Sequence, residues 1–291
     1  FTIQKDDFYP ELISAGVKDC YYLPQAAHPT IHQPLKLSFE QKKLYKADLS
    51  FMGAAYHNRI QSFPRLLDLD FKIWGTGWDL NSQLGKRVQN DNERVTTDET
   101  VKIYNAAKIN LNLHSSLYHY GINPDGDFVN PRTFEIASCK GFQLLDSRSD
   151  LSNLFNVDQE LVVFNSFEEL KDQFNFYISN PKLRSEIANR SYQRVLAEHT
   201  IEHRMQELLI HVFINRFDSL KKNQMSRLDP LSYCIEKAGK NTTLGKYLEE
   251  FEGAKNFSLK TLAAHIHKGK GDLDDNETLL MMMDQLMQEE V

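Results

Sequence analysis

The sequence predicts an α/β fold, in which helices flank a doubly wound parallel sheet and a helical region is appended at the C-terminus. Three observations indicate this. Short apolar segments alternate with amphipathic segments between residues 47 and 179, which is typical of the strands and helices of a parallel sheet. Beyond about residue 217 only short amphipathic stretches follow, separated by polar ones. The 291 residues also suffice for one large domain or two modest ones.

Within the sheet region, short apolar runs are predicted to be strands, and segments with a helical period lie between them. Thr97 is the expected N-cap of one helix, and Gly141 is expected to end another. The predicted strands are 20–24, 47–52, 71–74, 109–114, 142–145 and 160–164, and the predicted helices are 59–69, 97–107, 131–140, 150–155 and 167–179.

The C-terminal part is predicted to be helical throughout. A long, interrupted helix is expected over 181–217, followed by shorter helices at 231–237, 243–251, 259–267 and 279–287. We therefore expect three regions: a linker or remnant of an N-terminal domain at 1–35, a Rossmann-like domain with a long C-terminal helix at 36–217, and a helical extension at 218–291. Because the chain begins without Met and in the middle of a pattern, we expect it to be the C-terminal part of a longer protein, whose N-terminal domain is missing.

Composition and charge exclude several classes of protein. The net charge of −6 argues against a nucleic-acid binder, which normally has a basic face. No apolar run approaches the roughly 20 residues of a membrane span, and the first residues lack the basic and apolar parts of a signal peptide. Cys20, Cys139 and Cys234 are far apart and odd in number, which is typical of reduced thiols. We therefore expect a cytoplasmic protein.

The most informative segment is 129–146, which predicts a helix that opens onto an anion. Asn130 is a good N-cap, and Pro131 suits the first helical position. Arg132 and Thr133 then offer free main-chain N–H groups at the positive end of the helix dipole, with a guanidinium beside them. Glu135 follows directly, where its carboxylate can accept hydrogen bonds from sugar hydroxyls.

Other readings of the glycines and acids have weaker support. Gly75-Thr-Gly77 lacks the third glycine of the dinucleotide-binding pattern, which disfavours an NAD-type oxidoreductase. Asp125-Gly-Asp127 matches the Asp-x-Asp pattern of metal-dependent transferases, but it lies in a turn, where backbone geometry also favours Asp. His114 and His119 have no third ligand at zinc spacing. We therefore expect no metal.

An ordered set of motifs resembles the donor-binding C-terminal domain of group 1 glycosyltransferases with the GT-B fold, in the spore-maturation-protein-B-like branch. The resemblance covers roughly residues 15 to 215. It is carried by Leu49-Ser-Phe-Met-Gly53 with Arg59, Trp74-Gly-Thr-Gly-Trp78, Ile109-Asn-Leu-Asn-Leu-His114, residues 130–141, and Glu198-His-Thr200 with Arg204. It implies a two-domain enzyme, of which this chain holds the half that binds the nucleotide-sugar.

The resemblance assigns roles to charged residues. Glu135 matches the family glutamate that contacts the ribose of the donor. Asp127, eight positions earlier, stands where related enzymes carry an acid against the transferred sugar, although a turn residue is an equal alternative. Arg59 stands where the family has a cation against the diphosphate. Many relatives have a second arginine where this chain has Ala54, and we expect Arg132 to replace it.

The remaining donor contacts are expected from loops at strand ends. The main chain at Gly53, Gly75 and Gly77 should approach the donor, and Val88 lies where relatives pair their main chain with the base. His114, at the end of a strand, is either a donor contact or a satisfied structural histidine. Asn130 and Thr133 are expected to contact the donor from the helix start. Trp74 and Trp78 could stack on the base, although buried packing is the better expectation.

The sequence therefore predicts a glycosyltransferase, hexosyl or related, that transfers sugar without a metal ion and needs no cofactor. Its expected partners are a nucleotide-sugar such as a UDP- or GDP-sugar, an acceptor that is a carbohydrate, a protein or a lipid-linked molecule, and the missing N-terminal domain. The alternative is a degenerate, non-catalytic transferase domain that serves as a protein-interaction scaffold through its C-terminal helices. Ala54, Lys140 and the helices after residue 231 favour that alternative.

Overall fold

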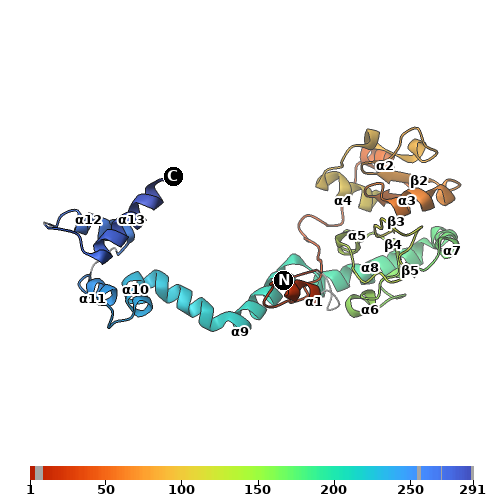
Figure 1. Ribbon diagram of the computed structural model, residues 1–291. Coiled ribbons are helices and arrows are strands. Elements are labelled where there is room, and N and C mark those ends of the chain that lie inside the picture. Colours follow the sequence, from red (N-terminus) through yellow and green to blue (C-terminus); the bar gives the residue numbers. More distant parts are fainter. Residues whose placement is uncertain (4–8, 254–256, 270, 290–291) are drawn as a thin grey trace. The chain divides into compact units, whose positions relative to one another are not determined.

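The computed structural model describes residues 1–3, 9–253, 257–269 and 271–289. It divides the chain into two compact units, Phe1–Leu208 and Leu209–Val291, which are described separately (Figure 1). The boundary falls within α9 (Ile201–Leu228). Among the described helices, none combines the length and the apolar character that crossing a membrane requires.

The first unit is built on a five-stranded parallel sheet, with the strand order β2-β1-β3-β4-β5. This is a doubly wound order whose direction reverses between β1 and β3, so the predicted fold class is confirmed. The strands are β1 (Leu49–Met52), β2 (Phe71–Trp74), β3 (Ile109–Asn112), β4 (Gln143–Asp146) and β5 (Val162–Phe164). Their carboxyl ends lie at one edge, where ligands bind in open α/β sheets.

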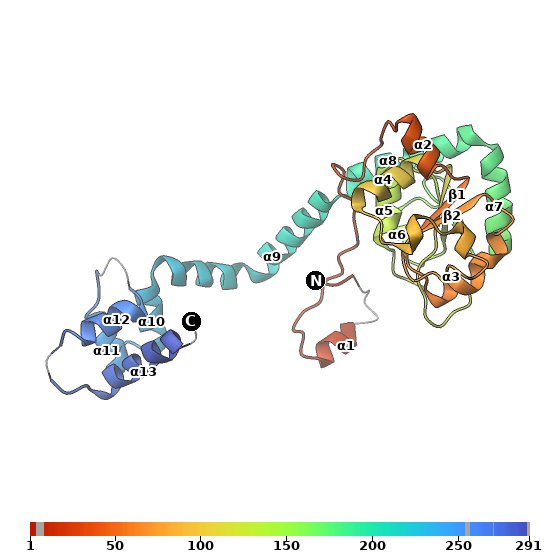
Figure 2. The same ribbon diagram turned by 90° about the horizontal axis from the view of Figure 1, so that it is seen from above.

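Helices cover both faces of this sheet (Figure 1 and Figure 2). The turn after α3 and the helix α7 bury Phe63, Leu66 and Phe174 against one face, and α4 and α5 bury Val101 and Ile136 on the other. The helices of this unit are α1 (Tyr9–Ser14), α2 (Phe39–Tyr45), α3 (His57–Ser62), α4 (Thr97–Ala106), α5 (Pro131–Ser138), α6 (Leu151–Leu154), α7 (Phe167–Ser179) and α8 (Pro181–Glu198), followed by the first part of α9.

The second unit is helical, as predicted. It contains the remainder of α9 with α10 (Pro230–Ala238), α11 (Thr243–Glu249), α12 (Leu259–Ile266) and α13 (Asp275–Glu289). Their apolar faces meet in a small core that includes Leu231, Ile235, Leu248, Leu262 and Ile266. Amphipathic helices of this length gain most of their stability from such packing.

Some local predictions were wrong. Residues 20–24 form no strand; Tyr22 makes only an isolated bridge to Thr2. The helix α4 is capped by Thr96 in a capping box with Glu99, so Thr97 is already helical. The predicted helix 59–69 is shorter, because α3 passes into a 3-10 turn at Phe63–Leu66. The helices α1 and α2 were not predicted, although Ser38 and Gln41 form the capping box of α2.

The end of α5 also differs from the prediction. Lys140, and not Gly141, adopts the left-handed conformation, with φ of +58°. Its N–H donates to the carbonyl of Ala137, and the N–H of Gly141 donates to the carbonyl of Ile136. This is the pattern that normally places glycine in the left-handed position. Lys140 therefore pays a conformational cost that glycine would avoid.

We expect Lys140→Gly to raise the stability of the first unit by about 0.5–1 kcal/mol, because glycine removes the left-handed strain. For a unit of this size the thermal midpoint should rise by roughly 2–4 °C, which calorimetry would measure. Lys140→Ala is the matched control and should bring no such gain, because it keeps a β-carbon at the strained position. A glycine variant no more stable than the wild type would contradict the assignment.

Candidate functional site

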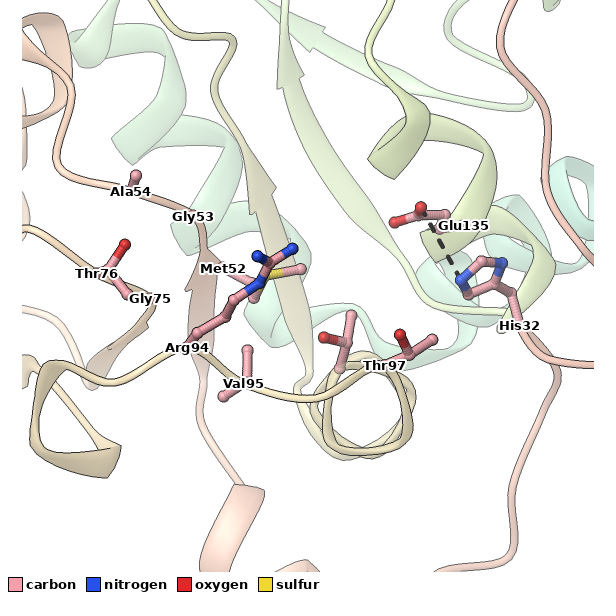
Figure 3. Close-up of a pocket in the computed structure, with 11 residues that line it drawn as sticks. His32, Met52, Gly53, Ala54, Gly75, Thr76, Arg94, Val95, Thr97 and Glu135 are labelled. Carbon is pink, nitrogen blue, oxygen red and sulfur yellow. Dashed lines mark ion pairs between the residues drawn. The ribbon is translucent and has the colours of Figure 1, made fainter. Parts of the chain in front are cut away.

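A cavity of about 430 Å³ opens at the carboxyl ends of β1 and β2, beside the point where the strand order reverses. Its walls come from the loops after both strands, the segment before α4, the helix α5 and the segment that precedes the sheet domain (Figure 3). The lining residues are His32, Met52, Gly53, Ala54, Gly75, Thr76, Arg94, Val95, Thr97, Thr100 and Glu135. Three of them, Gly53, Gly75 and Glu135, were predicted site residues.

Glu135 presents its carboxylate to this cavity from the second turn of α5 (Figure 3). The hydroxyl of Tyr104 donates to Oε2 over a long 3.5 Å, and Nε2 of His32 lies 3.9 Å from Oε1. Burial raises the pKa of Glu135, and the charge of Arg132 opposes that rise. The carboxylate thus keeps most of its hydrogen-bonding capacity for a ligand.

Two guanidinium groups meet behind Gly53. A β-carbon at that position would lie 2.6 Å from Nη1 of Arg132 and 3.2 Å from Nη1 of Arg59, so only glycine leaves room for both. Arg132 donates to the carbonyl of Met52 at 2.7 Å. Arg59 donates to the carbonyls of Ala54 and Leu113 at 2.9 and 2.8 Å.

No carboxylate of the described residues forms an ion pair with either arginine. The Nε atoms of Arg59 and Arg132 are also buried without a hydrogen-bond partner among the described atoms. Burial, together with the charge of Arg132, lowers the pKa of Arg59 to about 9. The end of β1 therefore carries two close guanidinium groups that lack an ion-pair partner among the described residues and are offset only by the more distant carboxylates of Asp146 and Glu135.

Neither arginine reaches the cavity directly, as a side chain that grips a phosphate would. Arg59 is only 1% exposed, and neither Arg59 nor Arg132 lines the cavity. Both guanidinium groups lie beside Gly53, which does line the cavity. Arg132 lies beside Gly53, directly before Ala54 in the chain, and donates to the carbonyl of Met52; that it replaces an arginine of the relatives stays a prediction.

The start of α5 is confirmed as a capped helix. The capping side chain also belongs to a network of hydrogen bonds among buried residues. The side chain of Asn130 accepts from the N–H of Thr133 at 3.2 Å and donates to Asn112 at 2.8 Å. Asn112 in turn donates to the hydroxyl of Thr133 at 3.0 Å. Asn130 and Thr133 are 5% and 0% exposed and lie outside the cavity lining. Both side chains thus hold the start of the helix in place, and their predicted contact with the donor stays a prediction.

His114 also holds α5 in place. Its Nε2 accepts from the main-chain N–H of Asn130 at 3.0 Å, so the ring proton is on Nδ1, which faces Asp146 at 2.7 Å. Asp146 is also paired with Arg148. Burial lowers the pKa of His114. Because both ring nitrogens are occupied, the satisfied structural histidine is the correct alternative.

Three other predicted contacts lie away from the cavity lining. Asp127 accepts from the N–H of Phe128 at 2.6 Å, as a turn residue does. Val88 bridges to Ile73 and packs against the main core. Gly77 is exposed, with φ of +80°. Among the described residues, no group of three or more His, Cys, Asp or Glu side chains is arranged to hold a metal ion.

The tryptophans pack inside the fold. Trp74 and Trp78 are each 3% exposed, and Nε1 of Trp78 donates to the carbonyl of Gly53 at 3.1 Å. Trp78 stacks on Phe63 with ring centroids 5.7 Å apart. Packing is therefore the role that the structure gives them, as the sequence favoured.

Sequence reasoning missed several lining residues. His32 belongs to a segment that we interpreted as a linker, and Arg94 lies in a loop without regular period. Thr97 and Thr100 were assigned only to helix formation. Signals for these residues are weak, because loop positions reach a site through tertiary contacts that no short-range pattern encodes.

Comparisons with known proteins identify the family and the fold of the chain. The model of the family described as glycosyl transferase-like matches residues 57–210. The spore protein CgeB of Bacillus subtilis is 28% identical over 206 residues, which are 67% of this chain and 61% of that protein. The chain thus spans about three-fifths of the length of this relative.

Two solved structures share the fold. Sucrose-phosphate synthase from Thermosynechococcus elongatus superposes with a TM-score of 0.52 at 12% identity, over 70% of this chain and 56% of that one. HepE from Anabaena, solved in complex with UDP and glucose, gives 0.53 at 9% identity, over 70% of this chain and 60% of that one. At such identities the likeness concerns the fold alone.

Proposed function

Since the chain belongs to the glycosyl transferase-like family, as a group 1 glycosyltransferase of the CgeB-like branch, we propose that its cavity binds the donor of a sugar transfer, a nucleotide-sugar such as a UDP- or GDP-sugar. The observation that carries this proposal is one cavity wall that pairs the carboxylate of Glu135 with the positive charge behind Gly53. A nucleoside diphosphate offers both complements: ribose hydroxyls for the carboxylate and phosphates for the charge.

The proposed reaction is a hexosyl or related transfer. A hydroxyl of the acceptor attacks the anomeric carbon of the sugar and releases its proton to the solvent, while the bond from that carbon to the diphosphate oxygen breaks. The diphosphate leaves with the bonding electrons, and its negative charge grows as the bond breaks. Arg59 and Arg132 stabilise that charge from behind Gly53, where the low dielectric strengthens their effect. The acceptor in this proposal is a carbohydrate, a protein or a lipid-linked molecule.

We place the charge stabilisation on these two guanidinium groups, so that the proposed transfer uses no metal ion. Arginine suits this role because it stays protonated and its planar fork matches phosphate geometry. Arg94 adds a third cation, whose side chain points into the cavity (Figure 3). Glu135 contributes to binding rather than bond breaking in this scheme, because it holds the ribose and so fixes the position of the diphosphate.

The test is a calorimetric titration of the full chain with UDP, GDP and ADP, and with the corresponding nucleosides. We expect one diphosphate to bind at least about tenfold more tightly than its nucleoside, because charge-assisted contacts to phosphate contribute about 1.5–3 kcal/mol. Excess EDTA should leave that affinity unchanged. Absence of binding by every diphosphate would contradict the proposal and favour the interaction scaffold. Loss of affinity in EDTA would contradict metal independence.

A further inference from the structure

The segment before the sheet domain is fixed against the wall of the cavity. The N–H of Ala27 donates to the carbonyl of His199 at 3.0 Å, and Ala27 is fully buried. The hydroxyl of Ser138, in α5, donates to the main-chain carbonyl of His32. The side chain of Asn105, in α4, donates to the carbonyl of Gln33 at 3.1 Å. This segment therefore belongs to the site and holds His32 at a defined position.

The orientation of the His32 ring follows from its own hydrogen bonds. Its Nδ1 accepts from the main-chain N–H of His28 at 3.3 Å. A neutral imidazole with Nδ1 as acceptor carries its proton on Nε2. Burial, together with the neighbouring His28, lowers the pKa of His32, which favours this neutral form at neutral pH. The N–H of Nε2 is then available as a donor.

That donor faces the same space as Glu135. Nε2 of His32 lies 3.9 Å from Oε1 of Glu135, and both side chains line the cavity (Figure 3). The separation is too long for a hydrogen bond between them. Nε2–H of His32 and the carboxylate of Glu135 can therefore each form a hydrogen bond with a ligand. One is a donor and the other an acceptor, and they lie side by side. This pairing suits a hydroxyl, or two adjacent hydroxyls, which both donate and accept.

We propose that His32 is a specificity-determining residue, whose Nε2–H donates to a hydroxyl of the donor's ribose beside Glu135, so that the site favours ribonucleotide-sugars over 2′-deoxyribonucleotide-sugars. This inference rests on the proposed function and narrows it, because deoxythymidine diphosphate sugars are then poor donors. A site built to bond a hydroxyl discriminates strongly against a ligand that lacks it, since its buried polar groups lose their partner.

The experiment measures the affinity ratio between matched ligands, UDP against 2′-deoxy-UDP and GDP against 2′-deoxy-GDP, by calorimetry on the full chain. For the wild type we expect the ribose form of whichever pair binds to be at least about tenfold tighter, as one lost hydrogen bond in a buried site predicts. In His32→Ala the ratio should fall at least about threefold, because Glu135 is then the only one of the two side chains left to contact the diol. His32→Gln retains a side-chain donor and should recover part of the preference.

Gln33→Ala is the matched control on the same segment, because Gln33 is exposed and absent from the cavity lining; it should keep the wild-type ratio. A wild-type protein that binds UDP and 2′-deoxy-UDP equally, or a His32→Ala protein that keeps the full preference, would overturn this inference while leaving nucleotide binding intact. If no diphosphate binds the wild type, the proposed function itself fails, so the two failures are distinguishable.

Discussion

Glu135→Ala is expected to weaken binding of the nucleoside diphosphate by about 10- to 100-fold, since hydrogen bonds to a charged group contribute about 1.5–3 kcal/mol. The loss should be as large for the nucleoside as for its diphosphate, because the carboxylate is proposed to hold the ribose and not the phosphates. Calorimetric titration of both ligands measures this directly. Unchanged affinity, or a loss confined to the diphosphate, would contradict the proposed role.

Glu135→Gln tests separately how the buried carboxyl of Glu135 affects the stability of the fold. Burial raises the pKa of Glu135 above its usual value of 4.5. The folded protein therefore holds this proton at pH values where the unfolded chain has already lost it. Its stability thus falls as the pH rises through this range. The glutamine variant has no proton to lose at this position and so lacks this loss of stability. At neutral pH its free energy of unfolding should therefore be at least that of the wild type. Below the usual pKa of glutamate the two proteins should be equally stable. Denaturant unfolding at several pH values measures both.

Arg132→Met is expected to weaken binding of the diphosphate by about 10- to 100-fold while changing the affinity for the nucleoside by less than about twofold. The reason is position, because Nη1 of Arg132 lies behind Gly53 with no carboxylate partner among the described residues. Calorimetric titration with UDP, UMP and uridine, or with GDP, GMP and guanosine, measures how much of the lost affinity each phosphate accounts for.

Arg65→Ala serves as the control for that series. Arg65 is exposed and pairs with Glu168 at 3.3 Å, and it does not line the cavity. Removing its charge should leave every affinity unchanged, since surface charges are screened by solvent and salt. Equal losses for nucleoside and diphosphate in Arg132→Met would indicate a disturbed fold and contradict a role at the phosphates.

The sequence predicted the sheet because its signals are local. The strand at 71–74 and the helix at 167–179 were predicted with the bounds that the structure has, since apolar periodicity and capping act over a few residues. The helix after Asn130 was predicted for the same reason. The way this helix ends was not predicted. The left-handed residue is Lys140, and the conformational preference of lysine disfavours that backbone conformation.

The candidate site was only partly predictable. Glu135 was found through a motif, and Gly53 through its place after a strand. His32 reaches the cavity because Ser138 and Asn105 fix a distant segment, which is a tertiary effect. His114 had to be left open between these two roles, because a histidine at a strand end resembles a ligand until its two partners are known.

The two arginines behind Gly53 have a consequence for turnover under the proposed function. A released nucleoside diphosphate carries more negative charge than the nucleotide-sugar from which it came. The same two guanidinium groups that favour bond cleavage in this proposal therefore hold the product more firmly than the donor. We therefore expect departure of the spent nucleotide, rather than breakage of the sugar bond, to limit the rate of the cycle.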